Sequence, residues 1–239
     1  MAGAAYSALS GMRNRLEELD RIAVDLANLS TPGYKTERSA QSASSRSAFE
    51  GTLDSAVDVT KGVTKIDFRQ GTIATTGRDL DAAIDGTGFF VIETPAGPRY
   101  TRNGAFSRSV DGTLVTADGL TVRGESGPIR LGKGPVAISG DGTIKVNNVP
   151  AGKLAVVDLQ EADAVRESGA RFNSRPGKTP EPVSSARIVG ASLENANVSM
   201  VDAMAHLTEV SRGFDSMQRG MSTVFNDMDE RAISELGRR

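Results

Sequence analysis

The stretch that decides the fold is LENANVSMVDAMAHLTEVSRGFDSMQRGMSTVFNDM, residues 193–228. Alternate steps of three and four residues from Leu193 reach only apolar side chains, and this spacing is typical of a helix with one continuous apolar stripe. The positions are Leu193, Ala196, Met200, Ala203, Leu207, Val210, Phe214, Met217, Met221, Val224 and Met228. The same steps near the start of the chain reach Ala2, Ala5, Leu9, Met12, Leu16, Leu19, Ala23 and Leu26. The sequence therefore predicts two terminal helices, each with an apolar face that needs a helical partner.

The ends of these helices are marked by local signals. The first helix is expected over residues 3–29, because Pro32 disfavours helical geometry at Thr31 and the pair Pro32-Gly33 suits a turn. The second is expected to begin near Val198, with Asn197 or Ser199 as the N-cap and Asp202 completing a capping box with Ser199. Leu193 and Ala196 are then left to an extended segment that precedes the helix.

The middle of the chain has the pattern of an all-β region. Turn-forming pairs divide it into short apolar runs, and glycine in such pairs supplies the positive φ that tight turns need. The pairs are Asp85-Gly86, Asn103-Gly104, Asp111-Gly112, Asp118-Gly119 and Asp141-Gly142. The runs are Phe89–Ile92, Leu114–Val115, Ile129–Leu131, Val136–Ile138, Ile144–Val146 and Leu154–Leu159. Their even spacing favours hairpins in a sandwich or an irregular barrel over βαβ units.

The expected fold class is α+β, in which long N- and C-terminal helices pair as a coiled-coil-like domain and a central all-β domain is made of short hairpins. Two connecting segments complete the chain: a Ser/Ala/Arg-rich linker with no sustained periodicity, and a returning arm that holds three prolines. The predicted divisions are residues 1–34 for the first helix, 35–70 for the linker, 71–172 for the β domain, 173–197 for the arm and 198–239 for the second helix.

Composition excludes several classes of function. The chain has 239 residues, a formal net charge of -2 and no cysteine, so thiol catalysis, disulfides and thiolate metal sites are ruled out. Without a basic excess we expect no nucleic-acid partner. We also expect no Sec-type signal peptide and no transmembrane helix, because no apolar run is long enough for a span and no basic segment precedes an apolar core.

The groups that could carry chemistry have simpler explanations. His206, the one histidine, could act as a general base oriented by Asp202, but a surface histidine with a polar neighbour four residues away is the more ordinary reading. Asp79, Asp81 and Asp85 lack the spacing of a calcium loop, and Asp85 suits the first position of a turn. The fragments Gly86-Thr87-Gly88 and Gly132-Lys133-Gly134 lack the context of phosphate loops. We therefore expect no enzyme activity, no cofactor, no metal and no small-molecule substrate.

The methionines and glycines of the second helix suggest an interface instead. Five of the chain's seven methionines lie in this region, and thioethers adapt to partner surfaces that differ in shape. Gly213 and Gly220 cost helix propensity and leave room for a close neighbouring backbone. The expected interface residues are Leu9, Met12, Leu16, Leu19, Leu26, Met200, Leu207, Val210, Phe214, Met217, Met221, Val224 and Met228.

Three stretches, in the same order, resemble one family. SALSGMRNRLEELDRIAVDLANLSTPGYK (7–35) is similar to the N-terminal signature of bacterial flagellar rod and other axial proteins, although Val24-Asp25 departs from the family's usual Ala-Asn-Asn. GTIATTGRDLDAAIDGTGFFVIETPAGPRYTRNGAFSRSVDGTLVTADG (71–119) resembles the β-domain motif of the rod and hook proteins. GASLENANVSMVDAMAHLTEVSRGFDSMQRGMSTVFNDM (190–228) resembles their C-terminal element. Within the basal-body rod family, the length and the segment from Ser39 to Ser47 are more similar to the proximal than to the distal rod protein.

The resemblance implies a structural role. The chain would polymerise with other axial proteins and with copies of itself into the hollow, torque-transmitting rod that crosses the periplasm. It would reach that place unfolded, through the flagellar type III export apparatus.

Two alternatives stay open at this point. One is a distal rod protein of the same family. The other is a β-domain binding module, for example for cell-wall glycan, on a coiled-coil stalk that closes within its own oligomer.

Overall fold

The computed structural model describes residues 2–40, 63–183 and 185–236. They form two compact units. The helical unit comprises Met1–Ala27, Ser39–Thr64 and Ser199–Arg239, and the β unit comprises Asn28–Arg38 and Lys65–Val198. Most of the predicted linker lies outside the described residues.

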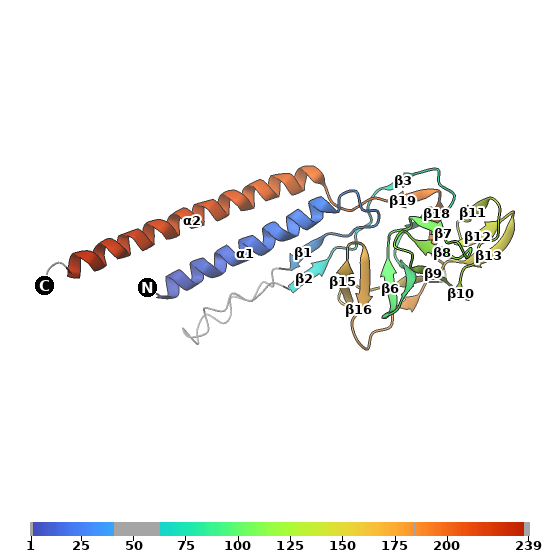
Figure 1. Cartoon of the computed structure of the whole chain (residues 1–239), viewed down its shortest axis with the longest axis horizontal. Coiled ribbons are helices and arrows are strands. Elements are labelled where there is room, and N and C mark those ends of the chain that lie inside the picture. Colours follow the sequence, from blue (N-terminus) through green and yellow to red (C-terminus); the bar gives the residue numbers. More distant parts are fainter. Residues whose placement is uncertain (1, 41–62, 184, 237–239) are drawn as a thin grey trace. The chain divides into compact units, whose positions relative to one another are not determined.

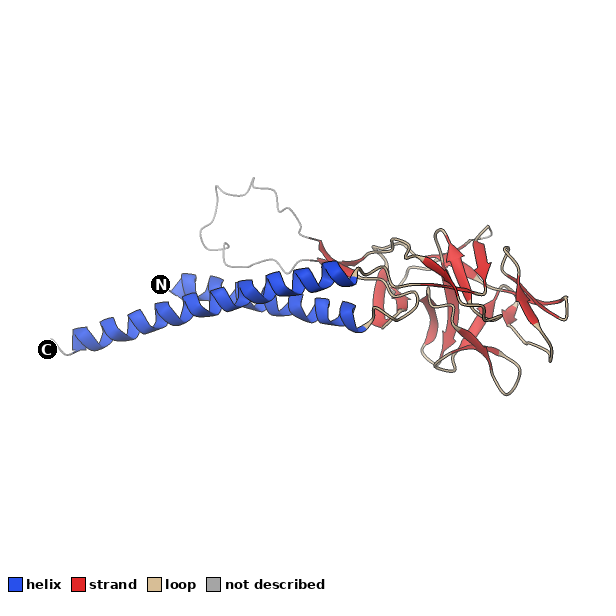
Figure 2. Ribbon diagram, turned by 90° about the horizontal axis from the view of Figure 1, so that it is seen from above, coloured by secondary structure: helices blue, strands red, loops and turns tan. Residues whose placement is uncertain are grey.

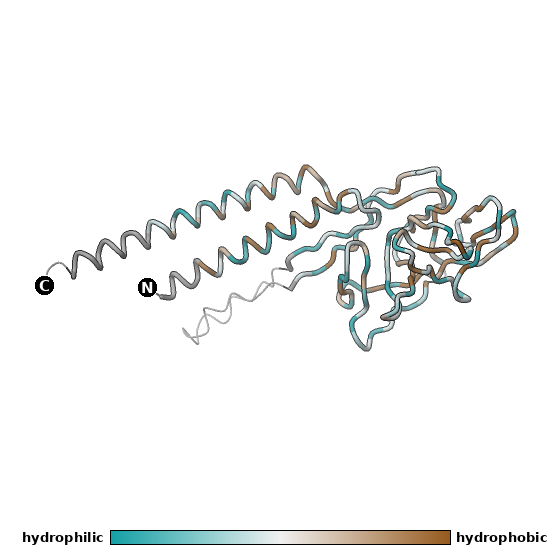
Figure 3. Tube along the Cα trace, in the orientation of Figure 1, coloured by the Kyte–Doolittle hydropathy of each residue, from teal (hydrophilic) through white to brown (hydrophobic). Residues whose placement is uncertain are grey.

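The helical unit holds α1 (Ala2–Ala27) and α2 (Met200–Leu236). The two helices lie side by side and run in opposite directions (Figure 1, Figure 2). Hydrophobic and hydrophilic stretches alternate along α1, as one apolar stripe on a helix requires (Figure 3). At the start of α2 the amide of Asp202 donates to Oγ of Ser199 at 3.3 Å, which confirms Ser199 as the N-cap. In the described ranges neither helix is both long and apolar enough to cross a membrane.

The predicted fold class is wrong. The described residues form two helices and a central multi-stranded β region. Among them, long helices paired as a coiled coil are not shown, because stripe residues that such pairing would bury are open to solvent. The exposed fractions are 59% for Leu9, 49% for Leu16 and 53% for Met200. The reason is physical, because a repeating apolar stripe shows which face of a helix favours burial and not whether its own chain supplies the cover.

The β region is also more than a row of short hairpins. Its ten-stranded sheet has the path β15-β16-β6-β5-β9-β8-β7, with β10 beside β9, and β14 beside both β5 and β17. Smaller sheets are β11-β12-β13, β18-β4, β19-β3 and β1-β2. Pairs such as β16 with β6 and β19 with β3 join segments that are far apart in sequence, and local turn signals do not reveal such pairs.

The strands lie as follows. They are β1 (Glu37–Ala40), β2 (Val63–Ile66), β3 (Ile73–Thr75), β4 (Ala82–Asp85), β5 (Phe89–Thr94), β6 (Gly97–Thr101), β7 (Phe106–Arg108), β8 (Leu114–Thr116), β9 (Thr121–Gly124), β10 (Gly127–Pro128), β11 (Val136–Ile138), β12 (Thr143–Val146), β13 (Val149–Lys153), β14 (Val156–Asp158), β15 (Ala164–Ser168), β16 (Arg171–Ser174), β17 (Glu181–Pro182), β18 (Arg187–Gly190) and β19 (Ser192–Glu194). Five of the six predicted apolar runs contain or lie in strands. The exception is Ile129–Leu131, of which only Arg130 forms an isolated bridge, with Thr113.

Strand β5 organises the core of the β unit. Successive side chains of a strand point to opposite faces. Phe90 and Ile92 accordingly pack into one hydrophobic cluster with Phe106 and Leu114, whereas Phe89 and Val91 pack into a second. In the second cluster the rings of Phe68, Phe89 and Phe172 lie 4.7–5.7 Å apart, in tilted or edge-to-face contacts. Strand β5 is therefore buried on both faces and fixes the segments that pair with it.

Candidate functional site

The predicted interface residues lie on the two helices with very different exposure. Leu9, Leu16, Met200 and Met217 are exposed, Val210 is fully buried, and the remaining described members are partly buried. These partly buried members are Met12, Leu19, Leu26, Leu207, Phe214 and Met221. The side chains of Val224 and Met228 lie outside the described residues. The helical unit thus presents apolar side chains that the described residues leave uncovered.

A polar contact joins the two helices beside this surface. Nε2 of His206 lies 3.0 Å from Oε1 of Glu18, and Nη1 of Arg15 lies 3.0 Å from the other carboxylate oxygen of Glu18. His206 is therefore paired across the helices, and not with Asp202 on its own helix as a general base would need. Its geometry supports a surface contact between α1 and α2.

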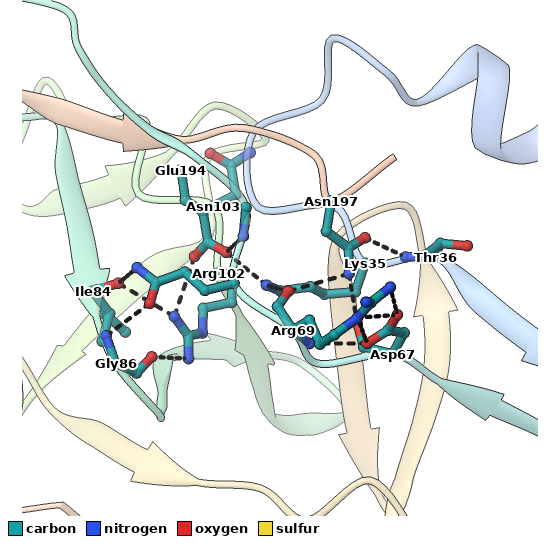
Figure 4. A network of polar contacts seen from close by, with 12 residues as sticks. Lys35, Thr36, Asp67, Arg69, Ile84, Gly86, Arg102, Asn103, Glu194 and Asn197 are labelled. Atoms are coloured by element: carbon teal, nitrogen blue, oxygen red, sulfur yellow. Dashed lines mark hydrogen bonds and ion pairs between the residues drawn. The ribbon is translucent and has the colours of Figure 1, made fainter. Parts of the chain in front are cut away.

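The β unit contains a buried charge cluster, which we define as Lys35, Arg102 and Glu194 (Figure 4). Their side chains are at most 3% exposed. Nζ of Lys35 lies 2.6 Å from Oε1 of Glu194, and Nη1 of Arg102 lies 3.2 Å from Oε2. One carboxylate thus bridges two cations that come from distant parts of the chain.

Backbone groups complete the coordination of the cluster. The amide of Gly71 donates to Oε1 of Glu194 at 2.9 Å, and Lys35 also donates to the carbonyl of Arg69 at 2.7 Å. Arg102 donates to the carbonyls of Ile84 and Gly86 at 3.3 and 2.6 Å. Nε of Arg102 is buried and has no hydrogen-bond partner among the described residues. Glu194 and backbone carbonyls thus supply the acceptors for the two cations of the cluster.

Burial controls the protonation of the two cations. Loss of hydration lowers the pKa of the Lys35 ammonium below its ordinary value, and this effect outweighs the opposing attraction of Glu194. Burial likewise lowers the pKa of Arg102, again against Glu194. Both directions show that the fold holds these cations at an energetic cost, which Glu194 offsets only in part.

Neighbouring contacts hold the segment that carries Lys35. Nε of Arg166 lies 2.6 Å from Oε1 of Glu37, and its guanidinium also donates to the carbonyl of Lys35 and lies 4.6 Å from the ring centre of Tyr34. On the other side, the amide of Thr36 donates to Oδ1 of Asn197 at 2.8 Å. The segment after α1 is thus fixed by β15 and by the residues that precede α2.

The acidic residues that sequence reasoning considered do not form a site. Oδ2 of Asp81 accepts a hydrogen bond from Thr76 at 2.6 Å, and Asp85 pairs with Arg187 at 3.4 Å. Across the described ranges, no three histidine or acidic side chains are grouped so that they could hold a metal ion. Asp81 and Asp85 have structural partners of their own.

Sequence reasoning missed the charge cluster. Lys35, Arg102 and Glu194 belong to the three stretches that carry the family resemblance, but the resemblance does not predict that they form one buried group. Glu194 is 159 residues from Lys35 and 92 from Arg102, so no local periodicity connects them. The sequence feature that could have indicated the cluster is that each of the three stretches holds a charged residue beside residues that favour burial.

Comparisons with known proteins support the same resemblance. A family model described as the flagellar hook protein FlgE/F/G D1 domain matches residues 83–149, and one described as the flagellar basal body rod FlgEFG protein C-terminal matches residues 189–235. Over 100% of this chain and 99% of its own length, the flagellar basal-body rod protein FlgF of Caulobacter vibrioides is 30% identical. FlgF of Rhizobium meliloti is 34% identical over 97% of each chain. The chain belongs to the flagellar basal-body rod protein family.

Within the rod protein family the chain is most like FlgF. The flagellar basal-body rod protein FlgG of Bacillus subtilis is 28% identical over 93% of this chain and 95% of its own length, so a distal assignment is not better supported. The D1 match contains Arg102 and the C-terminal match contains Glu194, whereas Lys35 precedes both. The charge cluster therefore connects the two regions that define the family to the segment that follows the first helix.

Proposed function

We propose that this protein is a structural subunit of the flagellar basal-body rod, without catalytic activity, at the proximal position. The observation that carries the proposal is the uncovered apolar surface of the helical unit, in a chain whose relatives are named as rod proteins. Other rod proteins and further copies of this chain are the partners that would cover it.

The energetics favour such covering. Burial of a leucine or methionine side chain contributes about 1.5–3 kcal/mol, so Leu9, Leu16, Met200 and Met217 together provide a substantial driving force. A contact between two different faces does not close on itself, and its repetition generates a helical filament. These two properties suit a subunit of a long, hollow shaft that transmits torque.

The interface of this assembly is proposed to comprise the thirteen helix residues named from the sequence. They are Leu9, Met12, Leu16, Leu19, Leu26, Met200, Leu207, Val210, Phe214, Met217, Met221, Val224 and Met228. The five-segment division of the chain is proposed with it: terminal segments 1–34 and 198–239 assemble, and segment 71–172 forms an outer β layer.

The route and the location complete the proposal. The chain is proposed to leave the cytoplasm through the flagellar type III export apparatus and to occupy the part of the rod that crosses the periplasm. A strain without a working export gate should keep the protein in the cytoplasmic fraction. Its appearance in the periplasm of that strain would contradict the proposed route.

The assembly surface can be tested by charge substitution. We expect Leu16→Lys to abolish swimming in soft agar and to remove the protein from purified basal bodies, because a buried, unpaired ammonium opposes association. The matched control is Val110→Lys, which places the same charge at an exposed valine of the β unit. Normal incorporation of Leu16→Lys, at normal protein level, would contradict the proposal.

Cysteine cross-linking identifies the neighbour directly. The chain has no cysteine, so Leu16→Cys introduces a unique thiol. In basal bodies it should cross-link to a rod protein or to another copy of the chain through a short bifunctional reagent. Val110→Cys serves as the exposed control in the β unit.

A further inference from the structure

The segment Ser192–Asn197, which we call the strap, is bonded to two other segments of the β unit. Its strand β19 pairs with β3, and the amide of Asn195 donates to the carbonyl of Thr72 at 2.9 Å. The carbonyl of Glu194 accepts a hydrogen bond from the amide of Gly33 at 2.7 Å. The strap therefore lies between the segment after α1 and strand β3.

The strap also carries the carboxylate of the charge cluster. Lys35 and Arg102 come from other segments, and both are buried beside Glu194. If the strap were in place without its carboxylate, two cations would face each other without hydration. Such unpaired buried charges are strongly destabilising.

We propose that the strap acts as a latch for the whole β unit. By this we mean that Lys35 and Arg102 can be buried stably only after the strap has docked and placed Glu194 between them. The cluster takes Lys35 and Glu194 from near the two ends of the β unit's sequence, and Arg102 from the position directly after strand β6. It cannot close until residues 35, 102 and 194 are all available. The strap is the last of these segments in the chain.

The latch has a consequence that rests on the proposed export. A chain that crosses a narrow channel unfolded presents its segments one after another. Whichever end leads, the cluster stays incomplete until both Lys35 and Glu194 have emerged, because they are 159 residues apart. The latch would thus delay stable folding of the β unit until nearly all of it is outside.

The test uses the purified full-length chain and the near-isosteric variant Glu194→Gln. We expect its apparent Tm to fall by roughly 10 °C, because an uncompensated pair of buried cations remains. Glu125→Gln is the matched control, since Glu125 pairs with Lys153 at 2.7 Å but is 49% exposed. This control should shift the Tm by less than about 2 °C.

Hydrogen exchange distinguishes a latch from a local contact. In Glu194→Gln we expect faster exchange in β5 and β6 as well as in the strap, because the whole β unit is destabilised together. Faster exchange confined to the strap, with β5 as protected as in the wild type, would overturn the proposal. So would an unchanged Tm.

A second variant keeps the test decisive if Glu194→Gln does not fold. In Lys35→Met/Glu194→Gln one of the two unpaired cations is gone, so the double variant should regain folded protein or melt above Glu194→Gln. A double variant no more stable than Glu194→Gln would contradict the electrostatic origin of the latch. These measurements need no rod, so failure of the proposed function and failure of the latch are separate outcomes.

Discussion

Gly33 shows how tightly the cluster is built at the scale of single residues. Its φ is +68°, a conformation that glycine adopts at little cost. A Cβ at this position would lie 2.3 Å from the carbonyl carbon of Arg102. The turn after α1 therefore needs glycine for its backbone conformation and for the close approach of the chain that carries Arg102.

A matched pair of alanine variants separates these two needs. Gly77 has a similar φ of +75° but open space around a Cβ. We expect Gly77→Ala to lower the free energy of unfolding by about 1–2 kcal/mol and Gly33→Ala by about 3–5 kcal/mol, because a backbone overlap adds to the same strain. Urea titration of both variants measures the difference. Equal losses would show that the approach of Arg102 does not matter.

Because of Lys35, the free energy of unfolding of the β unit is expected to change with pH in the alkaline range. Because burial lowers its pKa in the fold, the unfolded chain binds the proton more tightly. Between the folded pKa and the ordinary lysine pKa the unfolded state thus holds more protons, and stability rises with pH. The free energy of unfolding of the wild type minus that of Lys35→Met should increase as pH rises through this window.

The comparison with Lys35→Met removes a competing effect. Burial raises the pKa of Tyr100, so this group alone makes stability fall as pH rises above the ordinary tyrosine pKa. Tyr100 is present in both proteins, and its contribution cancels in the difference. A difference that decreases with pH would contradict the assignment of Lys35.

Turn residues were predictable because their signal is local. Gly86, Gly112, Gly119 and Gly142 have the positive φ expected from the Asp-Gly pairs. Gly104 is different: its φ is not in that region, and a Cβ there would lie 1.7 Å from the carbonyl oxygen of Ala82. This close approach is a tertiary contact, and it cannot be predicted from the dipeptide Asn103-Gly104 alone.

At the scale of elements, boundaries with chemical markers were predicted well. Helix α1 ends at Ala27, shortly before Ser30-Thr31-Pro32-Gly33, and α2 begins directly after the cap Ser199. Leu193 lies in strand β19, as expected for an extended continuation of the apolar stripe. The prediction of a strand at Ile129–Leu131 was wrong. Ile129 is apolar because it is buried in the hydrophobic cluster that contains Phe90, and this burial does not require a strand.

Gly220 provides a test of how α2 is used. It lies inside the helix, and no atom is within 4 Å of a Cβ built there. Gly220→Ala should stabilise α2 by about 0.5–1 kcal/mol and raise the helical signal in circular dichroism of the isolated chain.

The same variant reports on assembly. If a neighbouring backbone approaches Gly220 in the rod, Gly220→Ala should reduce motility despite the gain in helicity. Unchanged motility would place that neighbour elsewhere on the helix.

At the scale of the whole molecule, the sequence could not predict which segments pair. Strand β5 pairs with β6, β9 and β14, and β19 pairs with β3 across more than a hundred residues. Apolar periodicity indicates which face of an element is buried, but it does not show which other segment packs against that face. The same limitation explains the error about the helices: their apolar stripes show which faces favour burial, and not how much of each face the neighbouring helix covers.

The division into two units predicts two separable responses. Glu194→Gln should shift the thermal transition of the β unit, followed by near-ultraviolet circular dichroism of its tyrosines and phenylalanines. Leu9→Lys should leave that transition unchanged, because Leu9 belongs to the helical unit and is exposed.

Helix content gives the complementary measurement. In the dilute chain we expect a helical signal below that of complete helices of 26 and 37 residues, since each lacks its neighbours. A fully helical, cooperatively melting monomer would contradict this expectation.

The charge cluster finally has a consequence for how this β unit can change in evolution. The chain first enters the unit through the segment with Lys35 and finally leaves it through the segment with Glu194, and an ion pair holds these two points together. A module whose entrance and exit coincide can gain or lose residues at remote turns, such as Ser109–Gly112, without displacing its attachment. Lineages could therefore enlarge or trim the β unit while the framework that carries it stays the same.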